Sequence, residues 1–247
     1  MSLPAEQPKT SRWFVIAIGL AVVTVAGIAA LLQTRGIGDA TVCGPAAAPG
    51  VDWSGCRAEQ IKLTNANLTD AQLANVDFSR GEFDGTTLQG ADLTRAVLSR
   101  GDFTGALLAR TKFERAEALR ADFTGVNAEW ANFSKAELAR SRWKNARMLG
   151  ADFTKSDLQR ADLTGADLTN ATFAQAVLAR TDLRGATLTG ADFEEAYLLQ
   201  LNIEGSDLSQ SRGLTQAQID LTCGNGATKL PAGLNAPATW PCPPDSE

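Results

Sequence analysis

The sequence predicts an all-β solenoid with four short sides per coil, preceded by a single transmembrane α-helix. Three observations lead to this fold class. Large apolar residues recur at every fifth position from Leu63 to Leu208, a spacing that fits neither the 3.6-residue period of a helix nor the two-residue period of a strand. Glycine or asparagine recurs at every twentieth position from Asn65 to Gly205. An uncharged apolar run covers residues 13–32.

The apolar run at residues 13–32 is long enough to cross a bilayer, because a helix of this length spans about 30 Å. Lys9 and Arg12 precede it and favour a cytoplasmic N-terminus, residues 1–12. The competing interpretation is a cleaved signal peptide, whose apolar core is usually about 7–15 residues. We favour the uncleaved anchor because the run exceeds that length. Residues 33–52, rich in Pro, Gly and Ala, are expected to form a linker and an N-terminal cap.

The four cysteines lie in two groups, Cys43 and Cys56 before the five-residue pattern and Cys223 and Cys242 after it. No CxxC pair is present, and the chain has no histidine, so a zinc site is not expected. The grouping favours two local disulfides, Cys43–Cys56 and Cys223–Cys242, in an oxidising compartment. The alternative is four buried free thiols. With the anchor, this predicts a single-pass protein of the cell inner membrane whose body is periplasmic, or a secreted body if a signal peptide is cleaved.

The five-residue pattern predicts a chain that coils. The central position is Leu, Phe, Ile, Met or Trp in every unit except at Ala118 and Ala128. The position two residues earlier is mostly small, and residues two apart on an extended segment face the same way, so both point inward. The remaining three residues must then include a turn. Each unit is one short side followed by one corner.

A period of 20 residues predicts four sides per coil. Reading every twentieth residue from Asn65 gives only Gly or Asn, which tolerate the positive φ of a tight turn. Reading every twentieth residue from position 80 gives an arginine column: Arg80, Arg100, Arg120, Arg140, Arg160 and Arg180. Two interior columns are aromatic, one with Phe123 and Trp143 and one with Phe133 and Phe153.

The units ADFTK from Ala151, ADLTG from Ala161 and ADLTN from Ala166 follow the motif A(D/N)LxG, which resembles the pentapeptide-repeat family. The resemblance covers about residues 53–212. It implies a right-handed quadrilateral β-helix, here of about 7.5 coils (30 units, four per coil). Residues 213–247 are expected to cap its end, with a short helix at 215–220 that uses Thr215 as its N-cap.

No catalytic, cofactor-binding or metal site is predicted. Histidine, the commonest general base, is absent, and the regularly spaced Asp152, Asp157, Asp162 and Asp167 occupy outward, solvated positions. The arginine column is interpreted as a ladder of salt bridges, because an acidic residue follows most of its members two positions later. The alternative is a site for phosphate or an acidic partner. Arg142 breaks that pattern, so Arg140, Arg142, Lys144 and Arg147 form the candidate anion-binding spot.

Four outward apolar residues are the candidate partner surface: Trp130, Leu149, Tyr197 and Leu199. The net charge of −5 does not indicate nucleic-acid binding, and no small-molecule substrate is evident. The sequence therefore predicts a noncatalytic, membrane-anchored scaffold or protein-interaction module on the periplasmic side, an accessory subunit of a membrane or envelope complex. The alternative, which the resemblance implies, is a DNA mimic that modulates a topoisomerase such as DNA gyrase.

Overall fold

The computed structural model describes residues 43–44 and 46–241. The predicted cytoplasmic residues 1–12, the predicted anchor at 13–32 and Cys242 lie outside this range. Among the described residues, none of the helices has the length and apolar character needed to cross a bilayer.

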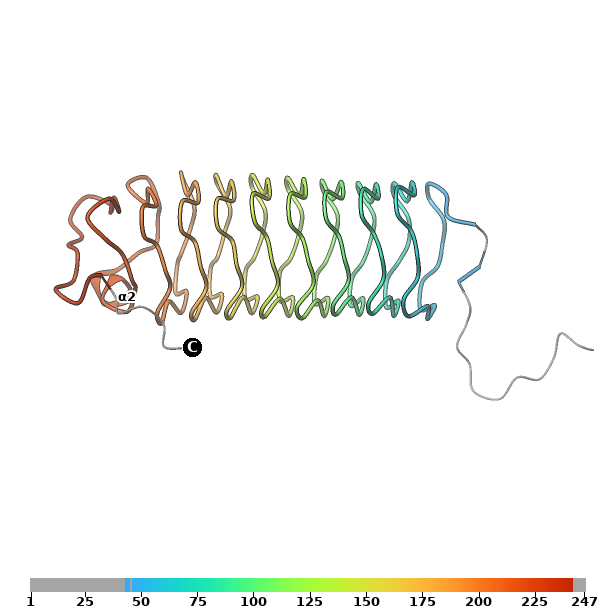
Figure 1. Cartoon of the computed structure of the whole chain (residues 1–247), viewed down its shortest axis with the longest axis horizontal. Helices are drawn as coiled ribbons and strands as arrows, with labels where there is room; N and C mark the ends of the chain where they lie inside the picture. Colours follow the sequence, from blue (N-terminus) through green and yellow to red (C-terminus); the bar gives the residue numbers. More distant parts are fainter. Residues whose placement is uncertain (1–42, 45, 242–247) are drawn as a thin grey trace, which may run out of the picture. The chain divides into compact units, whose positions relative to one another are not determined.

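The described residues form a stack of square coils, each 20 residues long (Figure 1). Parallel β-bridges join each coil to the next, beginning at Asp52↔Gln72 and keeping a 20-residue step as far as Asp192↔Arg212. A single bridge residue lies on each side, followed by a two-residue turn, so the described range contains isolated bridges instead of longer strands. This is the four-sided β-solenoid that the sequence predicts.

Every corner of the solenoid uses the left-handed backbone conformation. From Gly50 to Gly205, each fifth residue has φ between 54° and 70°. The sequence predicts this only for the Gly/Asn column, yet Arg100 has φ 61° and Trp130 has φ 58°. A non-glycine residue there costs about 1–2 kcal/mol. The ladder offsets that cost, because each corner N–H from Gly50 to Arg180 donates to a carbonyl of the coil above, as Arg100 N does to Leu119 O at 2.9 Å.

The core is a pair of aromatic stacks enclosed by aliphatic side chains. In one stack the ring centroids of Phe103 and Phe123 lie 4.9 Å apart, and those of Phe123 and Trp143 lie 4.0 Å apart. In the other, Phe133 and Phe153 lie 5.0 Å apart. The two stacks meet edge to face, with Trp143 and Phe133 5.1 Å apart and 87° between their planes. Flat rings therefore stack from coil to coil in the interior and pack edge to face between the two stacks.

The hydroxyl groups of inward-facing Ser and Thr residues form hydrogen bonds inside the solenoid. Thr86 Oγ1 donates to Leu63 O at 2.6 Å, one coil below. Ser141 Oγ donates to Leu138 O and accepts from the indole Nε1 of Trp143 at 2.6 Å. Among the described residues, no buried side-chain N or O atom lacks a partner. The buried side-chain polar atoms of the described solenoid are therefore all hydrogen-bonded within the structure itself.

Both ends of the described body are covered. Cys43 and Cys56 form a disulfide, and Trp53 nearby is buried against Phe78. At the other end the helix α2, Gln216–Ile219, follows its N-cap Thr215 in a capping box with Gln218. The Gln218 side chain also donates to Phe193 O and Ala196 O, which fixes the helix over the last coil.

The C-terminal cap changes the coil repeat. Its two bridges are Asn202↔Cys223 and Asp207↔Lys229, with steps of 21 and 22 residues in place of 20. Cys223 is disulfide-bonded, and its predicted partner Cys242 lies outside the described residues. The Trp240 indole Nε1 donates to Thr222 O at 2.7 Å. A short helix, Gln216–Ile219, and the described segment that follows it therefore come after the last regular coil.

The ion pair in this cap gives a testable pKa. Lys229 Nζ donates to Asp207 Oδ2 at 2.8 Å, and with bonds from Ser209 it lowers the pKa of Asp207 from 3.8 to about 2. We expect Lys229→Met to raise that pKa, measured by NMR titration of the full chain. Because the folded pKa is the lower one, the pair stabilises the fold above about pH 4 and ceases to do so as the pH falls toward 2.

The matched control is Lys62→Met, which removes the exposed ion pair between Lys62 and Glu82 at the other end of the solenoid. It should leave the titration of Asp207 unchanged. An Asp207 pKa that stays near 2 in Lys229→Met would show that the Ser209 bonds alone account for the shift.

Candidate binding surfaces

The regularly spaced aspartates stabilise the backbone of the corners. Asp152 Oδ1 accepts from the backbone N of Thr154 at 2.8 Å, and Asp162 and Asp167 bond the residue two positions on in the same way. In each case the carboxylate turns toward the following corner and supports its backbone. The recurrence of Thr or Ser two residues after Asp is the sequence signal for this role. Among the described residues no group of acidic or cysteine side chains is arranged to hold a metal ion.

The predicted salt-bridge ladder of the arginine column is wrong. Among the residues that the structure describes, none of the six arginines forms an ion pair, and Arg180 donates instead to Gln200 Oε1. The reason is the corner geometry. A corner residue with positive φ turns the chain onto the next side of the coil, so an arginine at the corner and the acid two positions later do not share an outward face.

The acidic residues on the side of the coil that follows the arginine corner bind other partners. Asp122 accepts from Thr124 and from Arg142 one coil above, and Asp162 accepts from Thr164 and lies 3.3 Å from Lys144 Nζ. Partial burial raises the pKa of both carboxyls, but these hydrogen bonds and cations together outweigh it and lower the pKa below the ordinary value. Both carboxylates are therefore ionised at neutral pH, and both already have hydrogen-bond and cationic partners within the chain.

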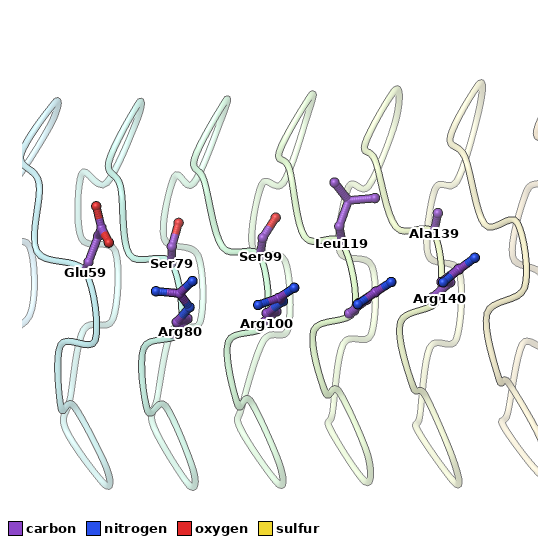
Figure 2. A pocket seen from close by; sticks show the side chains of 9 residues that line it. Glu59, Ser79, Arg80, Ser99, Arg100, Leu119, Ala139 and Arg140 are labelled. Carbon is purple, nitrogen blue, oxygen red and sulfur yellow. The ribbon is translucent and has the colours of Figure 1, made fainter.

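Four of the six arginines line an open groove of about 590 Å³. Figure 2 shows Arg80, Arg100 and Arg140 in a row along successive coils, with Ser79 and Ser99 beside that row. Arg120 lines the groove as well, together with Leu119, Ala139 and, at its N-terminal end, Glu59. All six arginines of the column are exposed. We call this feature the arginine groove.

The predicted anion-binding spot is distributed over several faces. Arg140 lies in the arginine groove, whereas Arg142 pairs with Asp122, Lys144 with Asp162, and Arg147 with Glu129. The ladder places Arg142 and Arg147 on two successive sides of the coil. Three of the four cations thus have carboxylate partners, and only Arg140 belongs to an unpaired set.

The predicted partner residues form two separate surfaces. Trp130 is 56% exposed at its corner, and its ring lies over Gly150 of the next coil beside Leu149. Any Cβ at Gly150 would meet that ring at 2.4 Å, so glycine there allows the tryptophan to lie flat. Arg110 and Asp70 line a groove of about 380 Å³ below Trp130.

The second surface lies at the C-terminal end of the solenoid, and we call it the Tyr197 patch. Its members are Val177, Tyr197, Leu199 and Leu221. Val177 and Tyr197 are bridge partners in successive coils, and Leu221 continues the column of Leu199, since Gln200 N donates to Leu221 O. Sequence reasoning missed Leu221 because it belongs to the cap, where the repeat step changes.

A family model described as pentapeptide repeats matches eight copies over segments that together span residues 50–210, more than half of the chain. A search of curated proteins returned no match.

Solved structures that match the chain include HetL from the cyanobacterium Nostoc sp. strain PCC 7120, a pentapeptide repeat protein involved in heterocyst differentiation regulation. It is 25% identical over 85% of this chain and 90% of its own, with a TM-score of 0.46. A pentapeptide repeat protein of the Arabidopsis thaliana thylakoid lumen is 28% identical over 45% of this chain and 77% of its own, with a TM-score of 0.35. QnrB1, a plasmid-mediated fluoroquinolone resistance protein, is 17% identical over 74% of this chain and 91% of its own, with a TM-score of 0.38.

Proposed function

Because this chain belongs to the pentapeptide-repeat family, we propose that it is a noncatalytic scaffold that binds a protein partner through the Tyr197 patch. Family membership also assigns the right hand to the quadrilateral coil. The patch carries the proposal because it joins apolar side chains from successive coils on a surface whose other outward positions are mostly polar.

The patch has the composition of an interface anchor. Tyr197 is 49% exposed, Leu199 37% and Leu221 40%. Tyrosine supplies a large contact area with a polar tip, and aromatic anchors of this kind dominate binding energy at protein interfaces. The hydrogen-bonded ladder holds the backbone at these positions, so little backbone ordering is required on binding.

The noncatalytic part of the proposal follows from the use of the polar groups. The repeated aspartates bond backbone N–H groups of the next corner, and the described buried side-chain polar atoms all have partners. The arginine groove is open and contains no paired acid and base at proton-transfer distance. A reaction requires a site of positioned groups, and these groups are committed to the fold.

We place the scaffold in the cell inner membrane, with residues 1–12 in the cytoplasm, the anchor at 13–32 and the solenoid on the periplasmic side. The Cys43–Cys56 bond and the bonded Cys223 support this location, because such bonds persist in oxidising compartments. There the protein would act as an accessory subunit of a membrane or envelope complex.

Photocrosslinking tests the patch. A photoreactive phenylalanine at Leu221, in the full chain in its native membrane, should attach to one specific protein. Leu199→Ser should reduce that product about tenfold or more, because anchor side chains contribute about 2 kcal/mol or more to binding. Leu107→Ser is the matched control, since Leu107 is exposed to a similar extent (40%) elsewhere on the solenoid, and it should leave the yield unchanged.

Equal yields from photoreactive residues at Leu221 and Leu107 would count against the patch. The location has its own test, protease digestion of intact spheroplasts followed by nonreducing mass mapping. A solenoid protected from external protease, with Cys43 and Cys56 as free thiols, would overturn the periplasmic assignment.

Surface charge and a gyrase assay distinguish the DNA-mimic alternative from the scaffold. A mimic presents continuous negative charge, whereas here two corners carry cations, one of them through Arg95, Arg115, Lys135 and Lys155 and the other through the arginine column. Strong inhibition of gyrase supercoiling by the full chain would favour the alternative over the scaffold.

A further inference from the structure

We propose that the arginine groove binds a small soluble phosphate monoester, with each phosphate group held between the guanidinium groups of two successive coils. The site comprises the four arginines that line the groove: Arg80, Arg100, Arg120 and Arg140. Of the two further arginines in the column, Arg160 does not line the groove and Arg180 already donates to Gln200. The site goes beyond the scaffold function and ends three coils before Leu199 of the Tyr197 patch.

The fold leaves these four guanidinium groups without partners. Their side chains form neither ion pairs nor side-chain hydrogen bonds among the described residues. Other surface cations, such as Arg142 and Lys62, are paired with carboxylates one coil away. Neighbouring arginines of the column belong to coils about 4.8 Å apart, so their positive charges repel one another. An anion placed between two of them relieves that repulsion.

The guanidinium groups are the main hydrogen-bond donors that the groove offers to a ligand. The corner N–H groups already donate to the coil above, as Arg80 N does to Ser99 O at 3.0 Å. The Ser79 hydroxyl donates to Asp77 Oδ1 at 2.7 Å, and the Ser99 hydroxyl lies 3.5 Å from Glu117 O. Arginine binds phosphate oxygens through two parallel N–H donors. A ligand in the groove is therefore held by arginine side chains.

Charge and oxygen count favour a phosphate monoester over a carboxylate or a phosphate diester. At neutral pH a monoester carries a charge of about −1.5 to −2 and three acceptor oxygens. It can therefore accept from two guanidinium groups and balance both of their charges. A carboxylate has one charge and two oxygens, which a single guanidinium can satisfy in a bidentate pair. A diester also has one charge and two unsubstituted oxygens, so the backbone of a nucleic acid matches a pair of arginines less well.

The four arginines provide two such pairs, Arg80 with Arg100 and Arg120 with Arg140. The centres of the two pairs lie two coils, about 9.6 Å, apart. Leu119, which is 39% exposed, precedes Arg120 and offers an apolar contact for the organic group of the ester (Figure 2). Glu59, the one acidic residue of the lining, lies at the N-terminal end of the groove. Beside the arginines the lining is otherwise uncharged.

The two adjoining sides of the coil favour a small ligand. Glu117 and Glu137 occupy bridge positions on the side before the arginine corner, and Asp102 and Asp122 occupy them on the side after it. A flat anionic membrane laid across the corner would approach these carboxylates as well as the arginines. A small soluble ester lies over the corner and contacts the arginines without meeting them.

The test is an NMR titration of the full chain with phenyl phosphate at physiological ionic strength. Two ligands with the same ring serve as comparisons: methyl phenyl phosphate, a diester with one charge, and benzoate, a carboxylate. Both should bind about fivefold or more weakly than phenyl phosphate, because neither can balance two arginines.

Arg100→Gln combined with Arg120→Gln removes one arginine from each pair and should weaken the binding of phenyl phosphate about tenfold or more. Glutamine suits these corners, because Gln60 and Gln175 already adopt φ of 59° and 58°. Arg100→Lys combined with Arg120→Lys keeps the charges but loses the paired donors, so its affinity should lie between those of the glutamine variant and the unchanged chain.

The matched control is Arg160→Gln combined with Arg180→Gln, which removes two charges from the same corner outside the groove. It should change the affinity less than about threefold, because salt screens charges that do not contact the ligand. Equal losses in the two glutamine variants would reduce the effect to net charge and overturn the proposal. Equal binding of phenyl phosphate and benzoate would overturn it too, as would groove signals that respond to bicelles containing phosphatidate and not to the soluble ester. Leu199→Ser should bind phenyl phosphate normally, which separates this test from that of the Tyr197 patch.

Discussion

Replacing Trp143 by alanine should lower the free energy of unfolding by about 3–5 kcal/mol. Trp143 is fully buried, stacks 4.0 Å from Phe123 and meets the edges of Phe133 and Phe153. The cavity would open in the middle of the core and weaken the contacts of its coil with both neighbouring coils. Since each coil of a solenoid touches only its neighbours, no other part can compensate. Urea denaturation of the full chain measures the loss.

Trp130→Ala is the matched control for this prediction. It removes the same side chain from a corner where it is 56% exposed and lies over Gly150. The loss there should be below about 1 kcal/mol. Equal losses at Trp143 and Trp130 would contradict the view that the stacked columns carry most of the stability.

Ser141→Ala should cost about 1–3 kcal/mol, although it removes only one oxygen atom. The Ser141 hydroxyl is the acceptor for the Trp143 indole N–H, at 2.6 Å, inside the core. Without it, that N–H is buried with no partner. Ser156→Ala is the control, because Ser156 Oγ donates to Phe153 O, which also accepts from Ser156 N, so its removal leaves no donor unpaired. It should cost less.

A double-mutant cycle tests whether the loss in Ser141→Ala comes from the unpaired indole N–H of Trp143. In the Ser141→Ala background, Trp143→Phe removes the orphaned N–H and places a ring that the stack already uses at Phe123 and Phe103. The two changes together should therefore cost less than the sum of the single changes. Additive losses, measured by the same denaturation, would mean that the indole N–H finds another partner.

The interior could be predicted from the sequence because its rule is local. Residues two apart on an extended segment face the same way, so Leu163 and Ala161 both point inward, and both are buried. Thr215 followed by Gln218 likewise specifies a helix start within four residues, and α2 begins there.

The exterior could not be predicted in the same way. Arg100 is an unlikely residue for φ 61° on propensity alone, and it adopts it because backbone bonds to the next coil hold the corner. Once the corner turns the chain, Asp102 no longer lies beside Arg100, and its Oδ1 accepts from Thr104 N instead. The pairing of Arg142 with Asp122 joins residues 20 apart, which only the stacked structure brings together.

The lengthened steps at the C-terminal end have a consequence for self-assembly. A regular coil offers the next strand a template of N–H and C=O groups, and a stack of such coils could in principle extend from molecule to molecule as a fibre. The steps of 21 and 22 residues at Asn202↔Cys223 and Asp207↔Lys229 take the chain out of that regular repeat, and α2 then covers the last coil. The template is thereby terminated at this end, so the coil stacking, which resembles the strand stacking of an amyloid-like filament, does not continue into a neighbouring molecule.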